Sequence, residues 1–132
     1  MLFDFDLTVT AGTLQSNPVT AKARLAKGLL TQIRVIFPPG PATLVYVVVK
    51  DRLFQLLPIN PDGNLNLDDA IVVTDLEYDI KDDPFTLDLV GWSPDAIFDH
   101  KITIQFEMQP AKNDSWSSFT QQLQQLISLS NG

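Results

Sequence analysis

Apolar and polar side chains alternate with a period of two over most of the first 110 residues, and this alternation limits the possible folds more than any other feature. In the first such segment, Phe5 and Leu7 would lie on one face of a strand and Asp6 on the other. Each segment of this kind predicts a half-buried β-strand. Similar segments follow at residues 19–25, 33–37, 76–80, 85–89 and 102–108.

One further segment, "TLVYVVV" at 43–49, is almost continuously apolar. Such a run is typical of a strand that is covered on both faces, or of one that lies at a subunit contact. The segment "RLFQLLP" at 52–58 follows directly, and we expect it to extend this strand past Asp51 and Arg52.

Turn residues separate these segments, as in "PPGP" at 38–41 and "NPDGN" at 60–64. The pattern predicts an all-β fold, a single antiparallel β-sandwich of about seven to eight strands with Greek-key or jelly-roll winding. We expect one β-sandwich domain at 1–110, followed by a C-terminal amphipathic helix or tail at 111–132.

The C-terminal segment changes period. Its apolar residues recur at spacings of three, four and three, which predicts one stripe along an α-helix; they are Trp116, Phe119, Leu123 and Leu126. No side chain after Asp114 is charged, and the opposite face is Ser, Thr and Gln. A helix of about four turns is marginal alone in water, so we expect it to dock on its own sandwich, on a neighbouring subunit or on a second protein. These four residues are the predicted interface.

The net charge of −7 argues against binding to nucleic acids and to anionic membrane surfaces, because both attract basic proteins. The charge is also unevenly placed along the chain. No acid lies between Leu7 and Lys50, whereas eleven acids and only two bases lie from Asp68 to Glu107. Two interpretations stay open: cross-strand pairing inside one domain, or a basic flank of one subunit facing an acidic flank of the next.

Residues suited to catalysis or metal binding are few. The chain has no cysteine, His100 is the only histidine, and Ser93 lacks a G-x-S-x-G setting. The acids between Asp75 and Asp99 fall mainly on the polar positions of strands, where they would be solvated. We therefore expect a non-enzymatic protein with no catalytic residues, cofactor or metal.

Two weaker alternatives concern binding. Hard oxygen ligands at alternate positions could hold calcium, although an Asx-rich turn is the simpler interpretation of Asn60, Asp62, Asn64, Asn66 and Asp68. A planar aromatic strip could bind a sugar; its candidates are Trp92, Tyr46, Tyr78 and Trp116.

The stretch "LTQIRVIFPPGPATLVYVVVKDRLFQLLPINPDG", followed by acidic alternating strands and "HKITIQFEMQP", resembles the small β-sandwich decoration or cement proteins of tailed bacteriophages. The resemblance is one of layout. It implies a virion protein, a homotrimer or similar ring, that is bound to a major capsid protein and stabilises the capsid lattice. A phage tail, baseplate or neck component and a carbohydrate-binding module are the alternative functions.

Overall fold

The computed structural model describes residues 1–110, and all of its regular structure in that range is β-strand. The eight strands are β1 (Leu2–Val9), β2 (Val19–Arg24), β3 (Gly28–Phe37), β4 (Tyr46–Asp51), β5 (Phe54–Leu57), β6 (Ala70–Ile80), β7 (Thr86–Trp92) and β8 (His100–Gln109). The predicted all-β class is confirmed. The predicted helix, and with it the whole 111–132 segment, lies outside the described residues.

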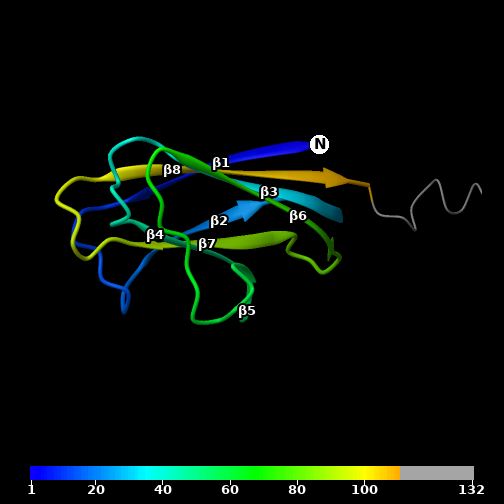
Figure 1. Cartoon of the computed structure of the whole chain (residues 1–132). Helices are drawn as coiled ribbons and strands as arrows, with labels where there is room; N and C mark the ends of the chain where they lie inside the picture. Colours follow the sequence, from blue (N-terminus) through cyan, green and yellow to red (C-terminus); the bar gives the residue numbers. More distant parts are fainter. Residues whose placement is uncertain (111–132) are drawn as a thin grey trace, which may run out of the picture.

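The strands form two four-stranded sheets, in the orders β1-β8-β3-β6 and β2-β7-β4-β5, and every pair is antiparallel. Figure 1 shows the sheets as two layers, with β1, β8, β3 and β6 in one and β2, β7, β4 and β5 in the other. No helix in the described range could cross a membrane.

One hydrophobic core joins the two sheets, and the period-two alternation builds it. The inward positions of the strands are mostly apolar, and side chains such as Leu7, Ile33, Leu89 and Phe106 are almost fully buried in one cluster. The two sheets approach each other closely at Gly91 of β7. A Cβ atom added there would lie 2.6 Å from Cγ2 of Val9, so a larger residue would force a neighbouring side chain to move.

The prediction for residues 52–58 was wrong in direction. The chain turns back after Asp51, and β5 pairs antiparallel with β4 instead of extending it. Arg52 in the turn has a φ of 56°, a left-handed backbone conformation that closes a tight hairpin. Apolar content alone does not reveal such a turn, because neither Arg52 nor Leu53 is a typical turn residue.

The apolar run in β4 is covered on both faces, as one of the two interpretations expected. Val47 and Val49 point into the core, and Val48 on the other face is only 2% exposed. Loop residues Pro18 and Gly63 lie over that outer face, together with Gln55 of β5.

Candidate interaction surfaces

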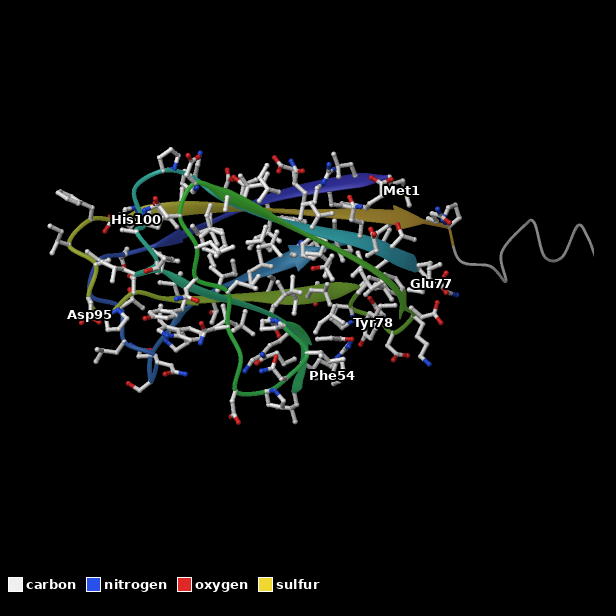
Figure 2. All side chains as sticks on the ribbon, viewed as in Figure 1. Met1, Phe54, Glu77, Tyr78, Asp95 and His100 are labelled. Carbon is white, nitrogen blue, oxygen red and sulfur yellow. The ribbon has the colours of Figure 1, made fainter. Side chains whose placement is uncertain are left out.

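The outer face of the β1-β8-β3-β6 sheet is predominantly acidic, and we call it the acidic face. Its bases are Arg34 and Lys101. Its acids come from β1, β6 and β8 and are Asp4, Asp6, Asp75, Glu77, Asp79 and Glu107. Figure 2 shows the Glu77 side chain pointing outward at one end of this sheet.

Several carboxylates on the acidic face have polar partners on neighbouring strands. Thr103 donates to Asp6 at 2.9 Å, and Lys101 forms an ion pair with the same carboxylate at 3.8 Å. Gln32 donates to Asp75 at 2.9 Å. The Glu77 side chain, in contrast, makes no hydrogen bond or ion pair with any residue in the described range, and it stays exposed.

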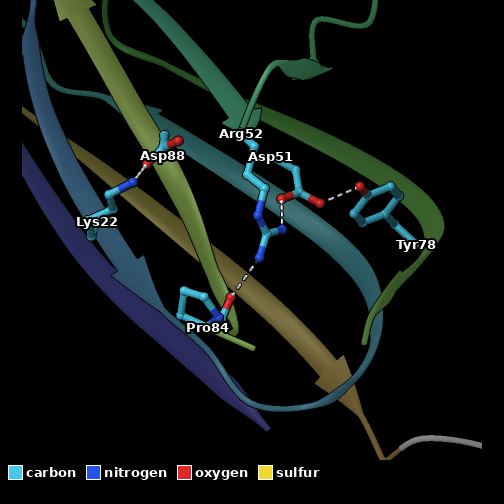
Figure 3. Close-up of polar contacts among 6 residues, drawn as sticks. All are labelled: Lys22, Asp51, Arg52, Tyr78, Pro84 and Asp88. Carbon is cyan, nitrogen blue, oxygen red and sulfur yellow. Dashed lines mark hydrogen bonds and ion pairs between the residues drawn. The ribbon is translucent and has the colours of Figure 1, made fainter. Parts of the chain in front are cut away.

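The outer face of the β2-β7-β4-β5 sheet carries the opposite sign, and we call it the basic face. Lys22 and Arg24 project from β2 and Lys50 from β4, around the single acid Asp88 of β7. Lys22 and Asp88 are cross-strand neighbours and form an ion pair at 2.5 Å, which Figure 3 shows. Three bases therefore surround one acid.

The two faces show how the uneven charge of the sequence is arranged in space. Four ion pairs occur within residues 1–110, and only Lys22–Asp88 connects the basic stretch 7–50 with the acidic stretch 68–107. Cross-strand pairing thus neutralises little of the uneven charge in this part of the chain. Among the charged residues that lie on strands, most of the opposite charges lie on opposite faces instead.

Two loops wall a groove on the basic face. One hollow of about 260 Å³ is lined by Gln15, Pro18, Val48, Asp62 and Trp92 among others, and a neighbouring one of about 320 Å³ lies between Lys22 and Lys50. The wall at 58–63 is held by the buried side chain of Gln55. Its Nε2 donates to three carbonyl oxygens at 2.7, 2.9 and 3.0 Å, those of Pro58, Asn60 and Gly63.

The aromatic side chains do not form the planar strip that sugar binding was expected to need. Trp92 is only 8% exposed, and its ring stacks on Tyr46 at a centroid distance of 5.7 Å. Tyr78 belongs to the other sheet and stacks on Phe54. These rings pack on protein, and Trp116 lies outside the described residues.

The Asx-rich segment acts as a brace for a neighbouring turn. Asp68 accepts from the backbone N–H groups of Gly40 at 2.9 Å and Ala42 at 3.0 Å, and these bonds lower the pKa of its carboxyl. Asn66 donates to the carbonyl oxygen of Thr43. No group of three or more His, Cys, Asp or Glu side chains in the described range is arranged to hold a metal ion.

A small polar cluster ties the two sheets together at the β4–β5 turn (Figure 3). The Tyr78 hydroxyl of β6 donates to Asp51, and Arg52 pairs with the other oxygen of the same carboxylate at 2.9 Å. Burial and the Asp51 hydrogen bond favour the neutral phenol and raise the pKa of Tyr78 to about 12. This geometry is that of a structural clamp.

The opposite end of the strands carries an exposed apolar surface, which we call the loop end: Leu14, Ile97 and Phe98. Their exposures are 58%, 81% and 67%. These residues come from the loops at 10–18 and 93–99. The two loops are fixed to each other, because the Ala11 N–H donates to Asp99 at 2.8 Å. Figure 2 places Asp95 and His100, which flank this loop, at the end remote from Met1.

Sequence reasoning missed the loop end. The signal was present as two adjacent apolar residues between the acids Asp95 and Asp99. Ser93, which was considered only as a nucleophile, is fully buried and donates to the Thr10 carbonyl at 2.8 Å. His100 begins β8 as a half-buried residue paired with Val9.

The predicted interface residues lie outside the described part of the chain; they are Trp116, Phe119, Leu123 and Leu126. The last described strand, β8, ends at Gln109 beside the N-terminus, where the Met1 amino group donates to the Met108 carbonyl at 2.8 Å. This end of β8 is remote from the loop end (Figure 2).

No protein-family model matches the chain, and no curated protein matches it.

Proposed function

We propose that this protein is a non-enzymatic structural component of a tailed-phage particle, a decoration or cement subunit that binds the major capsid protein and stabilises the capsid lattice. It would act as a homo-oligomer, a trimer or a similar ring, on the assembled virion. The proposal includes no cofactor, nucleic acid or membrane partner.

The strand order supports the fold part of this proposal. We infer that the two sheets, which share one core, form a jelly-roll sandwich, because the orders β1-β8-β3-β6 and β2-β7-β4-β5 are those of an eight-stranded jelly roll. Viral capsid proteins are one class that uses this winding, and lectins are another. Since fold alone does not assign function, the surfaces must carry the rest.

The loop end is the observation that carries the proposal. Adjacent Ile97 and Phe98 are 81% and 67% exposed, on a loop that Asp99 holds in place. Clustered apolar and aromatic side chains on a pre-organised loop are typical of the centre of a protein–protein contact. Attachment of this kind needs apolar area and shape, and it needs no perturbed titrating group.

The matching experiment removes the apolar loop end. We expect the double substitution Ile97→Ser and Phe98→Ser to weaken co-sedimentation with decoration-free capsid shells by about 100-fold or more, as for loss of two central contact residues. Leu53→Ser is the control, because Leu53 is 102% exposed in the β4–β5 turn at the other end of the strands. Unchanged shell binding by the double variant would contradict the role of the loop end.

The C-terminal segment provides a second test. Truncation after Pro110 removes the predicted interface of Trp116, Phe119, Leu123 and Leu126. We expect assembly or attachment to fall more than the unfolding midpoint does. Unfolding of the whole domain would instead show that this segment is a cover for its own core.

The location of the protein on the particle distinguishes a decoration subunit from a tail, baseplate or neck component. Immunogold labelling of purified particles should mark the capsid surface if the protein is a decoration subunit. Labelling confined to the tail, baseplate or neck would reassign it to that part of the virion. Absence of the chain from purified particles would overturn the virion proposal altogether.

A further inference from the structure

We propose that copies of this chain bind one another through two specific surfaces of opposite charge. The acidic strip on β6, formed by Asp75, Glu77 and Asp79, contacts the basic row on β2, formed by Lys22 and Arg24, of the next copy. This inference rests on the proposed oligomeric function and names the surfaces that would build the oligomer.

The spacing of the charges matches. Alternate residues of a strand lie about 6.6 Å apart on the same face. The three acids occupy alternate positions of β6, and the two bases occupy alternate positions of β2. Two strands laid side by side can therefore place each base opposite an acid without any change in either backbone. Lys50, on β4, lies about 10 Å across the basic face and extends it.

The charges are also available. Glu77, Asp79 and Arg24 are exposed, and none of their side chains forms a hydrogen bond or ion pair inside the described residues. Within the same range β6 pairs only with β3, and β2 only with β7, so both are edge strands. A long exposed edge strand commonly invites a partner, and the like charges along β6 direct it toward a basic one.

The position of the two strands defines the type of contact. β1 packs near β2, and Tyr78 of β6 stacks on Phe54 of β5, so β2 and β6 lie on opposite edges of the two sheets. A contact between opposite edges joins different surfaces of the two copies. Repetition of such a head-to-tail contact closes a ring when the rotation between copies fits.

Reversing the charge of each surface in a separate variant, and then mixing the two variants, tests the proposed contact. Variant one carries Lys22→Glu and Arg24→Glu, and variant two carries Glu77→Lys and Asp79→Lys. Each variant alone should be monomeric in sedimentation velocity at low salt, where the wild type is oligomeric. A 1:1 mixture should associate again, because each variant then meets a partner of opposite charge. Since the two variants must alternate, the mixture forms open or even-numbered complexes even where the wild type is a trimer. The wild-type oligomer should also weaken as salt shortens the range of the attraction.

Lys101→Glu with Lys81→Glu is the control for net charge. It changes the net charge by the same amount as variant one and leaves the basic row intact. Lys101 also matches Lys22 in setting. Both lysines pair with a cross-strand aspartate, and their side chains are 63% and 68% exposed. We expect this control to remain oligomeric. Circular dichroism of each variant shows whether the fold is kept.

The outcomes separate this inference from the proposed function. A wild-type chain that stays monomeric at micromolar concentration, or a mixture that stays monomeric, overturns the strip-to-row contact. If that monomer still binds capsid shells, the decoration function stands without this contact. If the mixture associates but the wild type binds no shells, the contact stands and the function fails.

Discussion

The outer faces of the two sheets follow the same alternation, yet their side chains have different environments. On the acidic face, Val73 is 54% exposed and Gln32 bonds to a surface carboxylate. On the basic face, Val48 is 2% exposed and Gln55 is 9% exposed. The loops at 10–18 and 58–66 cover one end of the basic face, whereas outward residues of β6 on the acidic face stay exposed within the described range.

This difference shows that an outward position on a strand is not the same as a solvated one. The alternation decides which side of the sheet a residue faces. Long connections then decide whether that side meets water or protein. The basic face thereby gains a walled groove, while the β6 edge of the acidic face stays open within residues 1–110.

The largest difference in stability is expected between substitutions of the two glutamines. Gln55→Ala removes the donor shared by the Pro58, Asn60 and Gly63 carbonyls and should destabilise the fold by about 2–3 kcal/mol. Gln32→Ala removes one exposed bond and should cost about 0.5 kcal/mol or less. Urea unfolding of both variants measures the difference. Equal costs would mean that the loop wall does not depend on Gln55.

A smaller contrast is expected for the two outward valines. Val48→Ala leaves a cavity under the loops and should cost about 2 kcal/mol, whereas Val73→Ala on the exposed β6 should cost about 0.5 kcal/mol or less. The free energies of unfolding give the comparison directly. If Val73→Ala were as costly as Val48→Ala, the acidic face would also be covered, by another part of the chain or by a second copy.

The smallest effect concerns the clamp that joins the two sheets. Tyr78→Phe should cost about 1 kcal/mol at neutral pH through loss of the Asp51 hydrogen bond. The pKa of Tyr78 is raised from 10.0 to about 12, so above pH 10 the unfolded chain loses this proton while the folded chain keeps it. Stability from this group is complete below pH 10 and is lost as the pH rises to about 12.

The advantage of wild type over Tyr78→Phe should therefore shrink between pH 10 and 12. Unfolding midpoints of the two proteins across this range provide the measurement, and other titrating groups cancel in the difference. An advantage that stays constant would show that the phenol titrates normally in the folded protein.

The sequence by itself determined the strands and their inward faces. Period-two alternation is a local property, and burial follows it directly, as Leu7, Ile104 and Phe106 show. The turn in the Asx-rich segment was also readable, and within it the Gly63 N–H donates to the Asn60 carbonyl. The bonds of Asp68 and Asn66 to the turn at 40–43 were not readable, because they join distant parts of the chain.

Only the tertiary structure decided the rest. The burial of Trp92 and the exposure of Ile97 depend on which loops cover which face, and those are contacts between residues distant in the chain. The reversal at Arg52 is a local hairpin, but its turn residues do not signal it. The uneven charge was visible along the sequence, but its division between two opposite faces required the strand order. Strand order arises from long-range pairing, which no local period encodes.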